Sequence, residues 1–345
     1  MSTPASSTIG RVTLDLDQLV SQGALSLTEA QRLKSVALPA QANRIIANVL
    51  LIFGAFMLVA GVLILRPPLD VGLGLAIGAL AIGGTLVYKA RDEWGLLGQT
   101  LVLMGIVGLG GWSALRFDEL GEPWPHLVAP FVAFITIIGA IASRNRVLAA
   151  LAPIALGGVI GAGTSYWDAT YSLYISEATV CILLFGTLAA GLLWLRPRLR
   201  SGLQDVALVG GRVSFILANF GFWVGSLWGD YPGEMWLSAR KYIWSYDQAW
   251  RATALYIPDY AFALAWPACL GLALYLGLKS HRRFVANTAI VFLAIHLYTQ
   301  FFERFYQQGG ALVVGGIGLI AFGFALVRFD RWQTGRMAQA RSERP

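Results

Sequence analysis

Residues 71–88 read VGLGLAIGALAIGGTLVY, a stretch that contains no charged side chain. A helix that crosses the hydrocarbon core of a bilayer, about 30 Å thick, needs about 20 mainly apolar residues, because each residue adds about 1.5 Å. The stretch is too long for a strand of a membrane barrel, about ten residues, and it lacks the alternation of apolar and polar side chains that such a strand requires. It therefore predicts a transmembrane helix.

Further stretches of the same character follow along the chain. The predicted spans are 45–65, 71–88, 95–115, 126–142, 147–166, 172–195, 206–228, 259–278, 284–305 and 309–327. Hydrophobic residues make up 57% of the chain and charged residues 13%, whereas a soluble domain carries about 25% charged residues. The expected fold class is all-α, a polytopic integral membrane bundle of about ten transmembrane helices.

The basic residues of the loops predict the orientation, because Lys and Arg are retained on the cytoplasmic side. With both termini inside, 19 of the 26 Lys and Arg residues fall in inside segments, and a shift by one helix would remove this bias. We expect a cytoplasmic helical hairpin at 1–44, a transmembrane domain at 45–327 with an outside interfacial loop at 229–258, and a basic cytoplasmic tail at 328–345. The net charge of +7 then reflects topology and attraction to anionic membrane lipids, so no nucleic acid partner is expected.

Two segments outside the spans have structure of their own. In residues 14–33, LDLDQLVSQGALSLTEAQRL, Gly23 can close one short helix, and Ser26 with Glu29 forms a capping box that opens the next. This hairpin is too small for an independent core, so we expect it to pack on the membrane domain or on a cytoplasmic protein partner. In the outside loop, Trp236, Ala239, Ile243, Tyr246, Trp250 and Thr253 follow helical spacing. That spacing fits an interfacial helix, although an aromatic-rich loop that caps the bundle fits equally well.

Polar side chains at membrane depth are candidates for function because burying them in lipid is costly. His296, Gln300 and Glu303 share one side of the predicted helix 284–305, with Arg304 beside them, and Glu177 enters the same outer leaflet from the span 172–195. These five residues could line an outer vestibule that binds a polar solute or passes protons through His296. The alternative is a solvated helix end with an aromatic belt, in which His296 forms a hydrogen bond between helices.

A second candidate lies in the inner leaflet, on the span 206–228. Arg212 and Asn219 share one face of this helix, and Gly221, Gly225 and Gly229 form a seam for close helix packing on the opposite face. Arg212 could bind an anionic headgroup or substrate from the cytoplasmic side, or it could extend its charged end to the inner water boundary. Because Arg212 and Glu177 belong to different leaflets, we do not expect them to pair.

The chain resembles a known family at its two ends. The residues that carry the resemblance are the N-terminal Leu19, Gly23, Leu25, Ser26, Glu29, Ala30 and Leu33, and the last pair of spans with FLAIHLYTQFFERF and LVVGGIGLIAFGFALVRF. This pattern is similar to that of the DUF2157-type membrane proteins of bacteria, in which a short hairpin precedes a polytopic domain without an established activity. The resemblance implies a bacterial inner membrane location and supplies no catalytic residue.

Several classes of function lack their sequence motifs. The chain has no P-loop, HExxH or GxSxG motif and no clustered Cys and His ligands, so we expect neither catalysis nor a cofactor or metal. The leading hypothesis is a non-enzymatic membrane protein that is structural, senses a signal or binds a partner. The alternative is a transporter or a lipid- or solute-handling protein that uses the outer vestibule. The oligomeric state stays open, a homo-oligomer included.

Overall fold

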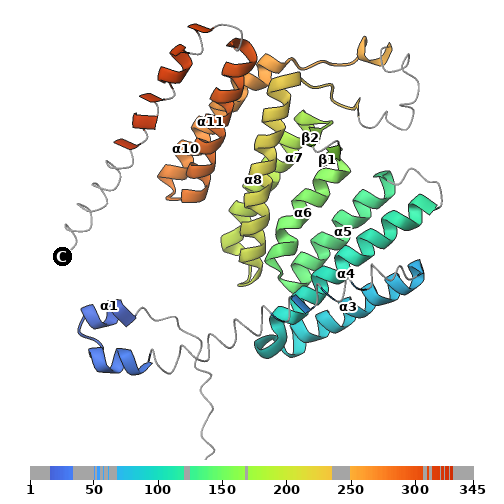
Figure 1. Cartoon of the computed structure of the whole chain (residues 1–345), viewed down its shortest axis with the longest axis vertical. Coiled ribbons are helices and arrows are strands. Elements are labelled where there is room, and N and C mark those ends of the chain that lie inside the picture. Colours follow the sequence, from blue (N-terminus) through green and yellow to red (C-terminus); the bar gives the residue numbers. More distant parts are fainter. Residues whose placement is uncertain are drawn as a thin grey trace, which may run out of the picture. The chain divides into compact units, whose positions relative to one another are not determined.

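The computed structural model describes residues 16–33, 68–119, 125–167, 170–234 and 249–305, with single residues and short runs within 50–61 and 309–328. Contacts divide the chain into two units, residues 1–109 and 110–345. The elements, all but η1 labelled in Figure 1, are α1 (Leu16–Ser21), α3 (Leu69–Lys89), α4 (Arg91–Glu119), α5 (Pro125–Ser143), α6 (Arg146–Val159), β1 (Ala162–Trp167), β2 (Thr170–Ile175), α7 (Ala178–Leu195), the 3-10 turn η1 (Arg196–Arg198), α8 (Leu203–Trp228), α10 (Asp259–Lys279) and α11 (Arg283–Phe305).

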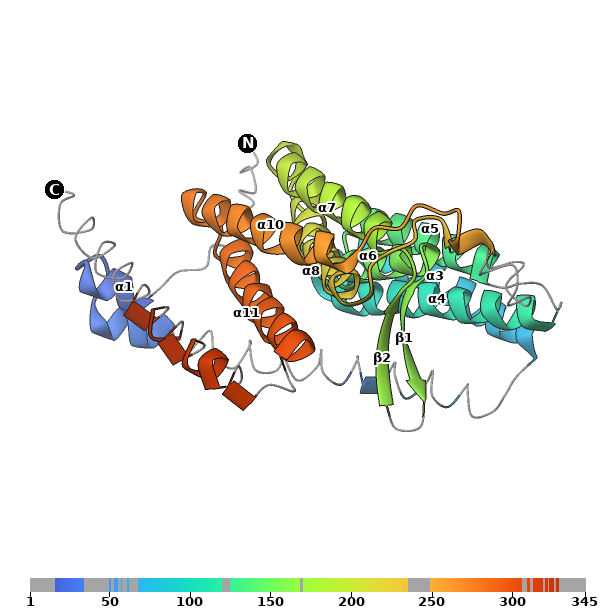
Figure 2. The ribbon, with the colours of Figure 1, turned by 90° about the horizontal axis from the view of Figure 1, so that it is seen from above.

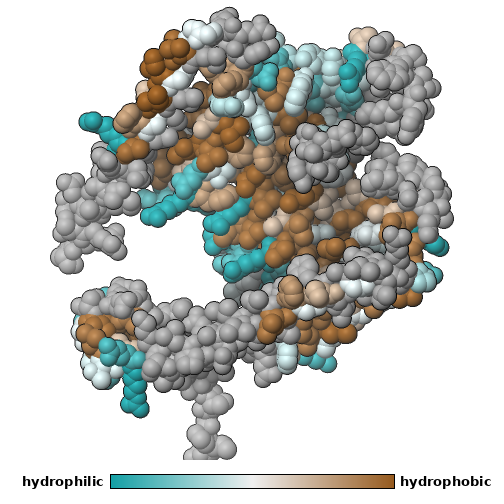
Figure 3. All heavy atoms as spheres, in the orientation of Figure 1, coloured by the Kyte–Doolittle hydropathy of each residue, from teal (hydrophilic) through white to brown (hydrophobic). Residues whose placement is uncertain are grey.

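The described residues confirm the all-α prediction, and their apolar helices are consistent with a multi-pass membrane protein. Among the described residues, six helices are long and apolar enough to cross a bilayer: Leu69–Lys89, Trp94–Phe117, Ala178–Arg198, Leu203–Trp228, Asp259–Lys279 and Arg283–Glu303. Large apolar side chains on them stay exposed, among them Leu183 at 63% and Leu264 at 72%, and brown hydrophobic residues cover much of the visible helix surface in Figure 3. Soluble proteins rarely expose such continuous apolar surface, whereas lipid tails cover it in a membrane.

The other four predicted spans have a different outcome. The predicted spans 126–142 and 147–166 correspond to α5 and α6, whose apolar parts, Leu127–Ser143 and Arg146–Val159, are shorter than the spanning helices. The predicted span 45–65 falls largely outside the described residues. The predicted span 309–327 is described in short runs, and it contains an apolar helix, Val313–Ala325, that is also shorter than the spanning helices.

A β-hairpin corrects the limits of two predicted spans. Helix α6 ends at Val159, and β1 and β2 then pair antiparallel from Ala162↔Ile175 to Trp167↔Thr170, in a hairpin that projects away from the helices (Figure 2). The predicted spans 147–166 and 172–195 were therefore too long, because Thr, Tyr and Trp in GTSYWDATYSLYI favour a pleated strand over a helix. As a result, α7 begins only at Ala178.

In unit 1, the N-terminal hairpin contains the predicted turn and cap. Gly23 has a φ of +71°, and the N–H groups of Ala24 and Leu25 donate to the carbonyl of Leu19 (3.0 and 3.3 Å), which closes α1. The second helix follows from residue 27. The Ser26 hydroxyl donates to Glu29 Oε2 (2.7 Å) while the Glu29 N–H donates to the Ser26 Oγ (3.2 Å), so the predicted capping box is confirmed.

Helices α3 and α4 of the same unit approach each other through glycines. A Cβ added at Gly83 would lie 2.8 Å from the carbonyl oxygen of Gly98, and one added at Gly105 would lie 2.8 Å from the carbonyl oxygen of Ala76. Only glycine permits backbones to approach this closely, and small residues are the usual means of packing helices in lipid.

In unit 2, α8 is the central helix. It packs against α6, α7, α10 and α11, and its predicted glycine seam is confirmed as a close-packing surface. A Cβ added at Gly221 would lie 3.1 Å from the Sγ of Cys181 on α7, and one added at Gly225 would lie 2.8 Å from the ring of Phe262 on α10. The seam thus brings both α7 and α10 against α8, and this determines where the loops at the two ends of these helices meet.

The loops of unit 2 gather at two opposite ends. A Cβ added at Gly202 would lie 2.8 Å from the Cδ of Arg144, and Arg146 forms an ion pair with Asp205 (2.6 Å). These contacts join the α5–α6 and α7–α8 loops. At the other end, residues before α7 contact the segment that follows α8. Loops that the charge pattern assigned to one side of the membrane therefore share one end of the unit.

Candidate functional site

Two sharp turns place cationic side chains at the end where the α7–α8 and α10–α11 loops meet. Pro197 cannot donate a helical hydrogen bond, and α7 tightens at Arg196 into η1. After α10, His281 adopts a φ of +53° and the N–H of Arg282 donates to the carbonyl of Gly277 (2.8 Å). Helix α11 begins at the next residue, Arg283. These turns bring η1 and the loop 280–282 to one cleft beside the first turns of α8.

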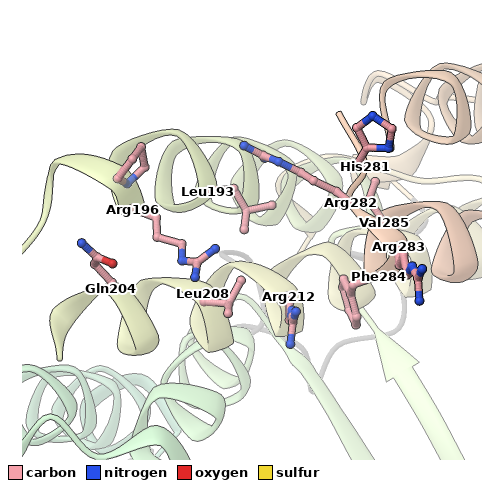
Figure 4. Close-up of a pocket in the computed structure, with 11 residues that line it drawn as sticks. Leu193, Arg196, Gln204, Leu208, Arg212, His281, Arg282, Arg283, Phe284 and Val285 are labelled. Atoms are coloured by element: carbon pink, nitrogen blue, oxygen red, sulfur yellow. The ribbon is translucent and has the colours of Figure 1, made fainter. Parts of the chain in front are cut away.

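The resulting basic cleft has a volume of about 530 Å³ and is lined by Arg196, Arg212, His281, Arg282 and Arg283, together with Leu193, Pro197, Gln204, Leu208, Phe284 and Val285. In Figure 4, Arg196 and Arg282 extend toward the space beside Leu193 from different segments, and Arg212 lies along the α8 side. Arg196 and Arg212 are partly buried, whereas Arg282 and Arg283 are exposed. The cleft is thus open to a ligand and has two cations near its floor.

Positive charge in the basic cleft is not balanced by acid from its own lining. No carboxylate is among the described residues that line it, and nearby Asp205 forms its ion pair with Arg146 instead. Arg212 lies over the ring of Phe284, 4.8 Å from its centroid, while the buried Nε of Arg196 has no hydrogen-bond acceptor among the described residues. The start of α11 adds backbone N–H groups without helical acceptors. This arrangement favours an anion.

Asn219, the second predicted residue of this face, lies deeper on α8 and has two hydrogen bonds. Its Oδ1 accepts from the indole Nε1 of Trp266 (2.9 Å), and its Nδ2 donates to the carbonyl of Phe215 (2.8 Å). It lines an apolar groove between α7, α8 and α10 that adjoins the basic cleft. The structure therefore separates the predicted pair: Arg212 faces the cleft, and Asn219 joins α8 to α10.

Glu177 lies at the opposite end of α7, about 24 Å of helix rise from Leu193, and therefore far from Arg212. It precedes the helix as its N-cap residue, is fully buried, and accepts at Oε2 from the N–H of Gly233 (2.8 Å). Sequence reasoning missed its neighbour Asp230, whose carboxylate accepts from the N–H groups of Ala178 (3.2 Å) and Thr179 (2.8 Å). The two carboxylates thus fasten the start of α7 and the segment after α8 to each other.

His296 and Gln300 contact α10 and α8 from α11. The ring of His296 is almost buried, with its centroid 5.0 Å from that of Trp266 in an edge-to-face arrangement. The amide of Gln300 donates to the carbonyl of Ser226 (3.3 Å). Both contacts hold helices together, whereas Glu177 accepts a hydrogen bond from Gly233, in the segment after α8. These contacts pack His296 and Gln300 against neighbouring helices, and the hydrogen bond of His296 between helices stays a prediction.

The remaining members of the predicted outer vestibule extend toward the end of α11. Glu303 is exposed, and Arg304 lies within the helix while its side chain falls outside the described part of the chain. Most of the predicted interfacial helix, residues 235–248, also falls outside it. Among the residues that the structure describes, no group of three His, Cys, Asp or Glu side chains could hold a metal ion.

Arg196, Arg282 and Arg283 are the cleft residues that sequence reasoning did not select. Their signal was present as two short basic loops, RPR and HRR, but each loop alone reads as an ordinary cytoplasmic charge cluster. They become one site only because α8 packs against both α7 and α10. Comparison with known proteins adds no assignment: no family model, curated protein or solved structure matches the chain.

Proposed function

We propose that this is a non-enzymatic, multi-pass inner-membrane protein that binds phosphate-bearing anions in the basic cleft, on the cytoplasmic side. The observation that carries the proposal is the lining of the cleft, in which four arginines from three chain segments meet with no carboxylate among the described lining residues. Guanidinium groups bind phosphate through paired, charge-assisted hydrogen bonds. The N-terminus of α11 contributes in the same direction, because helix N-termini favour anions.

The membrane arrangement that we propose retains about ten spans, both termini in the cytoplasm and a DUF2157-type organisation. The support is the grouping of loops at the two ends of unit 2, since the basic loops 144–146, 196–202 and 280–283 share one end. The positive-inside rule assigns that end to the cytoplasm. The N-terminal hairpin within 1–44 would lie on the same side and offers a surface to a cytoplasmic protein partner.

Transport through an outer vestibule is the competing function, and the contacts of its residues favour it less. Glu177 holds the segment after α8 through Gly233, and His296 packs on Trp266. A residue that carries a solute or proton must exchange its partners during each cycle, whereas these contacts join the helices on which the fold depends. Flux through liposomes that disappears in His296→Ala would favour transport over the function proposed here.

The test is the binding of pyrophosphate to the purified full chain, measured by calorimetry in neutral detergent at low salt. We expect the double variant Arg196→Gln/Arg282→Gln to bind at least about tenfold more weakly, because charge-assisted pairs to phosphate contribute about 1.5–3 kcal/mol each. Arg198→Gln is the matched control. Arg198 lies in the same turn but packs on Trp194, 4.1 Å from the ring centroid, and does not line the cleft. Equal affinity in all three proteins would refute the proposal.

A further inference from the structure

The basic cleft adjoins the apolar groove between α7, α8 and α10. Leu193, Arg282 and Val285 line both cavities, so the cleft and the groove meet at these three side chains. The groove has a volume of about 580 Å³. Its described lining is mostly apolar and includes Ile182, Gly186, Phe222, Cys269, Ala273 and Leu276. A molecule that occupied both cavities would need a negatively charged end and a hydrocarbon end.

The length of the groove matches one leaflet of a membrane. On α7 it extends from Leu193, at the cleft, to Ile182, which is about 16 Å of helix rise. Half of the hydrocarbon core of a bilayer is about 15 Å thick. An extended lipid tail whose headgroup lay in the cleft would therefore end near Ile182 and Cys269, close to the bilayer midplane.

The side of the groove is accessible from the surrounding lipid. Ala190 and Cys269 line the groove and are exposed, and so are the larger lining residues Trp194 (64%) and Leu276 (48%). A lipid tail could therefore enter sideways from the leaflet while its headgroup remained at the water boundary. This route avoids moving a charged group through the hydrocarbon core, which is costly.

We infer that the cleft and the groove together form a binding site for a membrane lipid with a phosphate headgroup. The phosphate lies among Arg196, Arg212 and Arg282, and one hydrocarbon chain lies along Gly186 and Ala273. The inference rests on the function proposed above and adds the class of ligand. Charge complementarity selects the headgroup, and the leaflet-long apolar groove selects a lipid over a free phosphate anion, which would fill the cleft alone.

A variant that blocks the groove and leaves the cleft intact tests the lipid site separately from the anion site. Gly186 lines the groove, and a Cβ added there would meet nothing within 4 Å, so Gly186→Leu places a side chain in the space that the lipid tail would use. Gly191→Leu is the matched control. Gly191 lies on the same helix and is equally free of neighbours, but it is not among the described groove residues. Both variants raise the helix propensity of α7 in the same way.

The experiment compares the retention of phosphatidylglycerol and phosphatidylcholine by native mass spectrometry with pyrophosphate affinity from calorimetry. We expect Gly186→Leu to retain at least about fivefold less phosphatidylglycerol than the wild type and Gly191→Leu, with pyrophosphate affinity unchanged in all three. Unchanged phosphatidylglycerol retention in Gly186→Leu would overturn the lipid site and leave the anion site standing. Absence of pyrophosphate binding in the wild type would overturn both.

A native cysteine provides a second measurement that needs no variant. Cys269 is exposed and lines the groove, whereas Cys181, the other cysteine of the chain, is buried. In wild-type protein in nanodiscs, phosphatidylglycerol should slow maleimide alkylation of Cys269 several-fold relative to phosphatidylcholine, because a bound tail covers the thiol. Pyrophosphate in phosphatidylcholine nanodiscs should leave the rate unchanged. Equal rates with the two lipids would contradict the lipid site.

Discussion

The two ends of the α7, α8, α10 and α11 group differ in how their charges are satisfied. At one end, the carboxylates of Glu177 and Asp230 are buried and accept hydrogen bonds from backbone N–H groups of a different segment. At the other end, the arginines of the basic cleft line a shared space in which the part of the chain that the structure describes places no carboxylate. Buried carboxylates that accept backbone hydrogen bonds hold two chain segments together, whereas charge of one sign gathered at one end lowers stability and prepares a site for a ligand.

Most residues that hydropathy singles out are therefore not among those that line the candidate site. Glu177 and His296 attracted attention because polar groups at membrane depth are costly, yet their described contacts connect helices and loops. The arginines 196, 282 and 283 lie in loops where basic residues are ordinary, and they line the cavity that fits an anion. A buried polar residue is therefore informative about function only after its partners are known.

The largest expected effect is at the carboxylate end. Asp230→Ala should lower the free energy of unfolding by about 2–3 kcal/mol, because the buried N–H groups of Ala178 and Thr179 would lose their acceptors. Asp230→Asn keeps one side-chain oxygen and should lose about half as much. The measurement is reversible unfolding of the full chain in bicelles. If Asp230→Ala were as stable as the wild type, the structural role of this end would be wrong.

The sequence predicts features that depend on residues close together in the chain, and it misses features that depend on contacts between distant segments. The helices and the Ser26–Glu29 box depend on residues within a few positions, and the prediction is confirmed for the box and for six long apolar helices of the described residues. The β-hairpin was missed because each strand is only six residues long and lies between two apolar helices. The basic cleft is lined by residues of η1 and of the start of α11. These segments are far apart in the sequence, and no periodic pattern predicts that they meet.

A smaller effect, and one of a different kind, is expected at the arginine end. Arg196→Gln should change the free energy of unfolding by no more than about 0.5 kcal/mol at moderate salt, since it removes repulsion as well as packing. At low salt, where charges are poorly screened, the variant should gain stability relative to the wild type. Unfolding in bicelles at two salt concentrations measures this difference. The control Arg198→Gln, outside the cleft lining, should show a smaller dependence on salt.

The smallest expected effect on stability is at Glu29. Unlike the charged groups at the two ends of the helix group, this carboxylate is exposed and its hydrogen-bond partners are local. The hydrogen bonds from the hydroxyl and the N–H of Ser26 lower the pKa of Glu29 below 4.5. A lowered pKa in the folded state means that the ionised form stabilises the hairpin at neutral pH. This contribution decreases as the pH falls through the folded pKa and is absent below it.

Ser26→Ala removes the hydroxyl, the larger of these contributions, so the pKa of Glu29 should rise toward 4.5 while the Ser26→Thr variant keeps it low. Carboxyl carbon NMR titration of the full chain in micelles measures the pKa directly. The Ala variant keeps the backbone N–H at position 26, which donates to Glu29 Oε2 at 3.0 Å in the wild type, so the rise should be incomplete. An unchanged pKa in Ser26→Ala would mean that the capping box does not persist in solution, and a full return to 4.5 would mean that the backbone bond is lost together with the hydroxyl.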